Sequence, residues 1–370
     1  MSTPPAGSSG GPPASTAPPL SEERQRAARA RIDALVELAK AHDAFIAQAH
    51  DYPDPDTLAS AYALAWLTKT LTGKEVHVGY GGIVGRAENR AMVKVLGMRL
   101  KKMTPGDFAR YDLIALLDTQ PESGNHSLPA ERAPDIVIDH HFPRDRTGPE
   151  PAYYDVGGDF GATSTKLTEL VRASGLTPPP EIATALFYGV KTDTSNLARV
   201  TTAKDVEAYT YLFPLVDRAL LADIEHPQVP LDYFRVLNKA LTRAKIHGNM
   251  IVADLGPVYT PDLCAELADR LLQVEGMKHA LATGWFEDGL FLSLRTRAGR
   301  KNAGRLLHGI VVGQKLGTAG GHGPMAGARI PVAGLSQRKR AALRKKVIDE
   351  VLSAFGEDTK HFHKLVPESD

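Results

Sequence analysis

Histidine and aspartate residues gather after short apolar segments at four separate points of this chain. The densest group, Asp139-His140-His141, comes directly after the apolar run 136–138. The others are a cluster at 50–56 and single aspartates after the apolar segments 113–117 and 188–190. Together they supply three imidazoles and five carboxylates: His50, His140, His141, Asp54, Asp56, Asp118, Asp139 and Asp193. Carboxylates brought together in a protein repel one another unless a counter-charge neutralises them, so we predict a site for divalent metal with enough ligands for two ions.

The donor set indicates which metals and which reaction suit this site. Oxygen and imidazole ligands without thiolate favour Mn²⁺ or Mg²⁺, with Zn²⁺, Co²⁺ and Fe²⁺ as competitors. Two such ions about 3.5–4 Å apart can share a hydroxide, lower the pKa of its parent water and stabilise charge on a phosphoryl oxygen. Hydrolysis of phosphoesters is the reaction that most needs this arrangement.

Each residue taken alone also has a structural interpretation. Asp56 precedes Thr57 and could cap the helix that begins there, and Asp193-Thr194 could form an Asx turn. The order and local spacing of the whole set favour the metal site over coincidence.

Composition sets limits on the class of protein. The chain has 370 residues, which exceeds what one core usually supports and predicts two domains. The net charge of +1 provides no strong field for long nucleic acid or anionic lipid, so we expect no partner of either kind. The single cysteine, Cys264, excludes a disulfide framework and a thiolate metal site, and we interpret it as a small apolar residue of a helix. A reducing cytoplasm suits this composition.

The chain ends and the apolar segments carry no targeting or membrane signal. Residues 1–21 are rich in Pro, Ser, Ala and Gly and lack the pattern of a signal peptide, so we expect a disordered tail. Ser21 can cap the helix that follows. No apolar run approaches the roughly 20 residues that cross a bilayer.

Short apolar strands alternate with helices over the first two thirds of the chain. We expect strands at 45–49, 75–78, 113–117 and 136–138, and helices at 57–71, 88–96, 162–173, 181–188 and 203–216. This alternation predicts an α/β fold with an open, mostly parallel sheet flanked by helices. Ligands of such sheets gather outside the carboxyl ends of the strands, where the polar clusters would therefore meet.

A second, smaller α/β unit is expected after a helical connection over 217–245. Strands at 250–253, 279–286 and 290–294 join helices at 261–272 and 338–352, with a hairpin turn at Asp288-Gly289 and a glycine-rich stretch over 317–327. We interpret the basic residues of the last helix as a solvated face, because no aromatic residues alternate with them.

The full pattern resembles the DHH phosphoesterase superfamily. The residues that carry the resemblance are His50-x-x-x-Asp54-x-Asp56-x-x-x-Ser60, Asp118, Asp139-His140-His141 and Asp193. Ala319-Gly320-Gly321-His322 is similar to the glycine–histidine motif of the DHHA1 domain that one branch carries. The resemblance covers about 25–355, and the chain length resembles the nanoRNase and 3′-phosphoadenosine-5′-phosphate (pAp) phosphatase branch, not the longer RecJ exonucleases.

The resemblance implies a domain plan. A tail over 1–21 would precede an N-terminal DHH catalytic domain over 22–216, and the helical linker 217–245 would lead to a DHHA1 substrate-binding domain over 246–356. The remaining residues, 357–370, would form a C-terminal tail. The active-site cleft would lie between the two domains.

The resemblance also implies roles for individual residues. His50 and Asp54 would hold one metal, Asp56, His140 and Asp193 the other, and Asp118 would bridge them. Asp139 would orient His140, while His141 would face the phosphate as a hydrogen-bond donor or acid. The substrate would contact Arg295, Gly320, Gly321 and His322. Ala319 departs from the family motif, which has a glycine there, and alanine would be strained if that position required a positive φ. Arg86 and Asn89, just after a predicted strand, would contact substrate or simply begin a helix.

The function implied is a metal-dependent phosphodiesterase, with Mn²⁺ as the favoured ion and Mg²⁺ or Co²⁺ as options. It would hydrolyse short oligoribonucleotides or dinucleotides to nucleoside 5′-monophosphates through a hydroxide activated by two metals. The same site would also suit a pAp phosphatase, a cyclic-dinucleotide phosphodiesterase or an exopolyphosphatase. An inactive nucleotide-binding module is a more remote alternative, and a homodimer is one option for its assembly.

Overall fold

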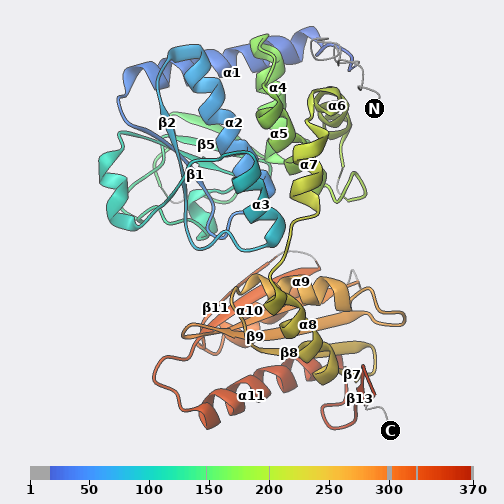
Figure 1. The fold of residues 1–370 in the computed structure, drawn as a ribbon. Coiled ribbons are helices and arrows are strands. Elements are labelled where there is room, and N and C mark those ends of the chain that lie inside the picture. The colour runs from blue at the N-terminus through green and yellow to red at the C-terminus, as the bar shows by residue number, and fades with distance from the viewer. Residues whose placement is uncertain (1–16, 147, 200, 298–301, 322–323, 368–370) are drawn as a thin grey trace, which may run out of the picture. The chain divides into compact units, whose positions relative to one another are not determined.

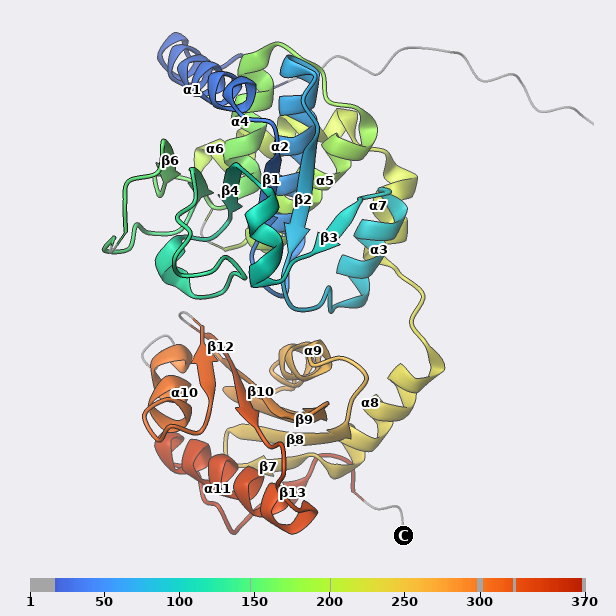
Figure 2. The same cartoon turned by 90° about the vertical axis from the view of Figure 1, so that its left-hand side faces the viewer.

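The computed structural model describes residues 17–146, 148–199, 201–297, 302–321 and 324–367. The chain forms two compact units, Met1–Pro227 and Gln228–Asp370, which we describe separately as unit 1 and unit 2. Figures 1 and 2 show the elements of each unit. Among the described helices, none is both long enough and apolar enough to cross a membrane.

Unit 1 is built on a six-stranded sheet in which every pair of neighbouring strands is parallel. The strand order is β3-β2-β1-β4-β5-β6. The strands are β1 (Phe45–Ala49), β2 (Val76–Tyr80), β3 (Leu100–Lys102), β4 (Leu113–Leu117), β5 (Ile136–Asp139) and β6 (Tyr153–Val156). The predicted α/β fold with a parallel sheet is confirmed.

The strand order places a reversal of winding between β1 and β4. From β1 the chain moves to β2 and β3 on one side, and from β4 it moves to β5 and β6 on the other. The segments that leave β1 and β4 therefore diverge beyond the carboxyl ends of these strands. Sheets of this kind bind ligands at such a switch point, because the diverging segments open a crevice there.

Helices and short turns cover both faces of this sheet. The helices are α1 (Glu22–Ala41), α2 (Pro55–Thr72), α3 (Ala87–Val95), α4 (Thr163–Ser174), α5 (Pro180–Asp193), α6 (Ala203–Leu212) and α7 (Arg218–Glu225). In β4, the side chains of Leu113 and Leu117 join the core beneath α2 and α5, while Ile114 and Leu116 pack on the opposite face with Phe108 from a 3₁₀ turn. The continuous apolar run of β4 thus reflects burial on both faces, and all five residues of β1, including the polar Gln48, are buried as well.

Local signals set where the helices of unit 1 begin and end. Ser21 caps α1, as predicted, by accepting the backbone N–H of Arg24 at 3.3 Å. Asp54 caps α2 by accepting the N–H groups of Asp56 and Thr57 at 3.0 and 3.1 Å. Gly73 ends α2 with a left-handed φ of 75°, the conformation that glycine adopts without steric cost.

Unit 2 contains a seven-stranded sheet of order β11-β12-β10-β9-β8-β7-β13, in which only β8 and β9 pair in parallel among the described strands. The strands are β7 (Lys245–His247), β8 (Met250–Pro257), β9 (His279–Phe286), β10 (Gly289–Thr296), β11 (Thr318–Gly320), β12 (Met325–Pro331) and β13 (His363–Lys364). The helices are α8 (Leu231–Arg243), α9 (Asp262–Leu271), α10 (Ala303–Val311) and α11 (Gln337–Phe355).

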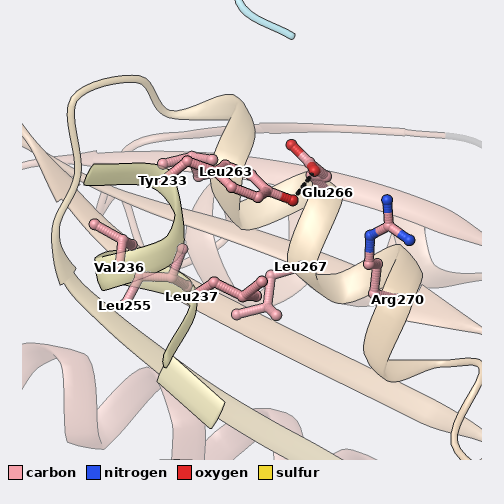
Figure 3. A pocket seen from close by; sticks show the side chains of 8 residues that line it. All are labelled: Tyr233, Val236, Leu237, Leu255, Leu263, Glu266, Leu267 and Arg270. Carbon is pink, nitrogen blue, oxygen red and sulfur yellow. Dashed lines mark hydrogen bonds between the residues drawn. The ribbon is translucent and has the colours of Figure 1, made fainter. Parts of the chain in front are cut away.

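The helices of unit 2 divide between the two faces of its sheet. Ala280 and Ala282 of β9 face the core formed with α8 and α9, and Leu281 faces the core formed with α10 and α11. Figure 3 shows the narrow pocket between α8, α9 and β8, where the Tyr233 hydroxyl donates to Glu266 at 2.5 Å. That contact ties α8 to α9 and keeps α8 within unit 2.

The structure differs from the prediction in two domain boundaries and in the position of one turn. The predicted linker 217–245 is not a separate segment, because α7 packs in unit 1 through the buried Ile224 and α8 packs in unit 2. Residues 357–370 do not form only a tail, since β13 pairs with β7. The β9–β10 hairpin turns at Glu287-Asp288, one residue before the predicted Asp288-Gly289, with Glu287 at a φ of 48°.

In the glycine-rich stretch, Gly321 has the backbone conformation that requires a glycine. Ala319 lies in β11, is paired with Ala328 and has no positive φ, so the predicted strain at this position does not arise. Gly321 instead has a φ of 140°, and a Cβ there would lie 2.6 Å from the Cα of Ala326. Only glycine fits this position without a shift of the neighbouring strand β12.

We expect Gly321→Ala to destabilise unit 2 by about 1–3 kcal/mol, because it combines an unfavourable φ with a backbone collision. Gly320→Ala is the matched control, since a Cβ at Gly320 meets nothing within 4 Å. Urea unfolding of both variants measures the difference. Equal stability of the two variants would contradict the conclusion that position 321 requires glycine.

Candidate metal centre

The predicted ligands of unit 1 meet at the switch point of its sheet. His50 follows β1, Asp118 follows β4, and Asp139 is the last residue of β5. Asp193 differs from the prediction that each cluster follows a strand, because it is the last residue of α5. A carboxylate at a helix C-terminus faces the negative end of the helix dipole, so this position also calls for a neutralising charge.

One group of possible ligands consists of His50, Asp54 and Asp118. Nε2 of His50 lies 3.7 Å from a carboxylate oxygen of Asp54 and 3.7 Å from one of Asp118. Nδ1 of His50 lies 2.9 Å from the backbone carbonyl of Asp51 and donates to it. This bond fixes the tautomer and turns the lone pair of Nε2 toward the two carboxylates.

A second group consists of Asp56, His140 and Asp193. Nε2 of His140 lies 3.3 Å from Asp193 and 3.6 Å from the Asp118 oxygen that faces away from His50. Asp118 thus presents one oxygen to each group, which is the geometry of a bridging ligand.

The arrangement fits metal ions better than direct hydrogen bonds. Nε2 of His140 is buried and has no hydrogen-bond partner among the described residues. The ligand atoms are 3.3–3.7 Å apart, too far for good hydrogen bonds. Two ligands each about 2.1 Å from one ion lie roughly 3.0–3.5 Å apart. The residues present are therefore able to hold divalent metal, with no thiolate among the ligands.

Asp139 and His141 form a hydrogen-bonded pair beside these groups. Nδ1 of His141 lies 2.7 Å from an Asp139 oxygen, and Gln120 donates to the other oxygen at 2.7 Å. The prediction that Asp139 orients His140 is therefore wrong. Asp139 orients His141, because the tight turn after β5 brings the ring of residue 141, and not that of residue 140, back over the carboxylate.

Thr163 links three of the predicted ligands and was not identified from the sequence. Its hydroxyl donates to Asp118 at 2.8 Å and accepts the backbone N–H of His140 at 3.2 Å. Its own N–H donates to Asp56 at 2.7 Å, and the N–H of Ser164 donates to the other Asp56 oxygen at 2.7 Å. The sequence could have indicated this role, because the N-cap residue of α4, Ala162, has no side chain able to cap the helix, so another residue must accept its first N–H groups.

These bonds revise the structural interpretation of Asp56. Asp56 caps α4, a helix more than 100 residues further along the chain, and Asp54 caps its own helix α2. The positive end of the α4 dipole thus points at the carboxylates of the site and partly offsets their charge.

Asp118 has an unusual backbone conformation. Its φ is 58°, in the left-handed region that a non-glycine residue enters at a cost of about 1–2 kcal/mol. Its N–H donates to the carbonyl of Ile138 at 2.9 Å, which holds the turn against β5. Aspartate and asparagine tolerate this region better than most residues, so the turn and the carboxylate are compatible at this position.

The pKa values of three crowded carboxylates are raised above their usual range. Burial, followed by repulsion from Asp54, raises the pKa of Asp56 to about 6. Burial, followed by repulsion from Asp56, raises the pKa of Asp193 to about 8 and that of Asp118 well above its usual range. A bound dication would reverse this by favouring the ionised forms.

The pKa values of the three histidines depend on burial and on the charged groups around them. Burial and the nearby His141 lower the pKa of His140 to about 4, so His140 is neutral at pH 7. Burial alone would lower the pKa of His141, but its hydrogen bond to Asp139 and the attraction of the nearby carboxylates together outweigh burial and raise this pKa. Burial would likewise lower the pKa of His50, but attraction to Asp54 and the hydrogen bond to the Asp51 carbonyl together outweigh burial and raise this pKa. In turn, His50 offsets the effect of burial on Asp54 and lowers its pKa to about 2.

The residues predicted to contact substrate lie in both units. Asn89 is buried in α3 and donates to the carbonyl of Pro53 at 3.1 Å, which holds the segment before α2, and Arg86 is the N-cap residue of α3. In unit 2, Arg295 is 8% exposed and pairs with Asp269 at 2.5 Å. Gly320 ends β11 and Gly321 follows it, while His322 lies outside the described residues.

Comparison with known proteins connects unit 1 to a family. Residues 45–190 match the DHH family, N-terminal domain. The chain is 35% identical over 307 residues to the uncharacterised protein MJ1633 of Methanocaldococcus jannaschii, a match that spans 82% of this chain and 62% of that protein. The chain thus spans less than two thirds of the length of that relative.

Two further comparisons show a protein with a similar sequence and a solved structure with a similar fold. The chain is 28% identical over 308 residues to the bifunctional oligoribonuclease and PAP phosphatase NrnA of Thermus thermophilus, which covers 78% of this chain and 84% of that protein. The crystal structure of an exopolyphosphatase-related protein from Bacteroides fragilis matches with a TM-score of 0.63 and 16% identity, over 88% of this chain and 97% of that one. This last likeness shows the fold alone.

We expect Thr163→Val to weaken Mn²⁺ binding by about 10- to 100-fold, because the hydroxyl that orients Asp118 and receives the N–H of His140 is lost while side-chain volume is kept. The backbone N–H to Asp56 remains in this variant. Thr163→Ser keeps the hydroxyl and is the control, expected to bind Mn²⁺ nearly as the parent protein does. Calorimetric titration of both variants with Mn²⁺ measures the effect, and equal affinities would contradict the role of Thr163.

We expect the metal-free protein to lose stability as pH rises from 6 to 8. Burial and repulsion raise the pKa of Asp56 to about 6 and that of Asp193 to about 8 in the folded state, so folding takes up protons. Most of the Asp56 contribution is lost by pH 6, and the loss of stability between pH 6 and 8 comes mainly from Asp193. Bound Mn²⁺ removes the effect, because the carboxylates are then ionised ligands. Melting temperatures with chelator and with Mn²⁺ across this pH range test the expectation, which parallel curves would contradict.

Proposed function

From the match of residues 45–190 to the DHH family, we propose that the chain is a metal-dependent phosphodiesterase acting on short oligoribonucleotides or dinucleotides. The products would be nucleoside 5′-monophosphates. The observation that carries the proposal is the pair of metal-binding groups that share Asp118. The activity in the name of the Thermus thermophilus relative supports the choice of substrate.

Two divalent ions, with Mn²⁺ favoured, would be held by the two groups described above. His50 and Asp54 would hold the first, and Asp56, His140 and Asp193 the second, with Asp118 between them. Bound there, the ions would supply an activated water and neutralise charge on the phosphate. The neutral imidazole of His140 and the fixed tautomer of His50 are the protonation states that metal ligation requires.

His141 would act on the phosphate directly. Its Nδ1 is engaged by Asp139, which leaves Nε2 as the atom able to donate a proton or a hydrogen bond. The hydrogen bond to Asp139 raises the pKa of His141, so the ring keeps its second proton closer to neutral pH. The side chain is 43% exposed, which gives a substrate access to it. These features suit protonation of the leaving oxygen.

Unit 2 would bind the part of the substrate away from the scissile bond. We assign residues 246–356 to a DHHA1-like domain, with contacts to substrate from Gly320, Gly321 and His322. Arg295 would have to exchange its partner Asp269 for a phosphate to contribute, because this ion pair engages it in the structure. The single cysteine, Cys264, is buried, in keeping with the cytoplasmic location we propose.

Hydrolysis of pAp is the second candidate. The same ligands would serve a phosphomonoester, and the name of the Thermus thermophilus relative includes this activity. A cyclic-dinucleotide phosphodiesterase or an exopolyphosphatase would use the same site, with no feature of unit 1 that favours either. An inactive binding module fits poorly, because His50, Asp118 and His140 converge with their donor atoms still able to ligate metal.

The proposal is tested with purified full-length protein, Mn²⁺ and four substrates: pApA, pAp, a cyclic dinucleotide and polyphosphate. We expect pApA to be hydrolysed to AMP with the highest kcat/KM. Turnover of polyphosphate without turnover of any nucleotide would overturn the proposal.

We expect Asp118→Asn to lower kcat by roughly 10²–10³-fold or more, because the variant keeps the left-handed turn but removes the charge shared by both metal groups. Its fold should remain, since asparagine tolerates the same φ. Asp223→Asn, an exposed position on α7, is the control and should leave kcat unchanged. Near-normal turnover by Asp118→Asn would contradict the bridging role.

A further inference from the structure

The segment that follows the metal groups exposes an aromatic ring beside them. Phe142 comes directly after His141, and 93% of its surface is exposed, more than for any other large apolar residue among those described. Burial of a phenylalanine side chain is worth about 1.5–3 kcal/mol, and this ring obtains none of it within the described structure. An apolar ring so placed is available to an incoming ligand.

The backbone that carries this ring is held in place, although the side chain is exposed. The buried amide of Gln120 donates to the carbonyl of Phe142 at 3.1 Å and accepts the N–H of Arg144 at 2.8 Å. The same amide donates to Asp139 at 2.7 Å, so one side chain fixes both the ring-bearing segment and the partner of His141. These bonds therefore hold the backbone of Phe142 next to the Asp139–His141 pair.

A cation lies on the same segment. Arg144 is exposed and makes no ion pair within the part of the chain that the structure describes. Two residues apart, its Cα is within about 7 Å of that of Phe142. A guanidinium and an aromatic ring carried by residues this close in the chain suit the two halves of a nucleotide, since arginine binds phosphate and an aromatic face stacks on a base.

We propose that Phe142 is a stacking platform for a nucleobase of the substrate and that Arg144 contacts the phosphate of the same nucleotide. This inference rests on the proposed function and deepens it, because it identifies the substrate as a base-bearing nucleotide and places one base next to His141. Stacking tolerates any base, so the platform selects nucleotides over polyphosphate without selecting a sequence. Gln120 is a positioning residue that couples this platform to the Asp139–His141 pair.

The test compares binding of AMP and ribose 5-phosphate to Mn²⁺-loaded full-length protein by calorimetry. For Phe142→Ala we expect AMP to bind about ten-fold more weakly, equivalent to about 1.4 kcal/mol, while ribose 5-phosphate is unaffected. Phe142→Trp should restore the preference for AMP. Arg144→Met should weaken both ligands alike, because both carry the phosphate. Phe234→Ala, an exposed phenylalanine of α8, is the control and should change neither.

The outcomes separate this proposal from the one it rests on. If Phe142→Ala leaves the ratio of AMP to ribose 5-phosphate affinity unchanged, the platform is refuted, whatever the enzyme hydrolyses. A change in melting temperature or in oligomeric state with that ratio unchanged would mean that the ring packs on unit 2 or on a second copy, and would also refute it. If the parent protein hydrolyses no nucleotide but its preference for AMP depends on Phe142, the platform stands and the proposed function falls.

Discussion

Repulsion among buried carboxylates is the constraint on which the rest of this structure depends. Asp56, Asp118 and Asp193 lie close enough that burial and mutual repulsion raise the pKa of each. A fold tolerates such a cluster when cations, helix dipoles and hydrogen-bond donors offset the charge. Unit 1 provides the donors itself, and its ligand geometry suits cations for the remainder.

The offsetting donors also tie the site to the fold. The first turn of α4 gives two N–H groups to Asp56 and, through Thr163, a hydroxyl to Asp118. The Ile138 carbonyl accepts the N–H of Asp118. Loss of the metal charge would therefore affect the packing of α4 and β5 as well as catalysis, because Asp56 and Asp118 take part in both.

The hydrogen bonds around the Asp139–His141 pair hold side chains and backbone in position. One oxygen of Asp139 accepts from His141 and the other accepts from Gln120, so these two bonds fix the orientation of its carboxylate. Gln120 extends the pair into the segment that bears Phe142. The carboxyl ends of the strands thus bring candidate metal ligands, His141 and an aromatic ring together from neighbouring turns, which is how parallel sheets commonly build sites.

The sequence by itself determined the α/β class, the long helices and the set of candidate ligands, because apolar runs, caps and residue types are local properties. Tertiary structure alone decided that Asp193 comes from a helix end, that Asp139 serves His141, and that Thr163 and Gln120 complete the site. It also decided the short edge strands β3, β6, β11 and β13, which have too few residues for a period to show. The physical reason is that hydrogen bonds between residues distant in the chain leave no local pattern, whereas burial and capping do.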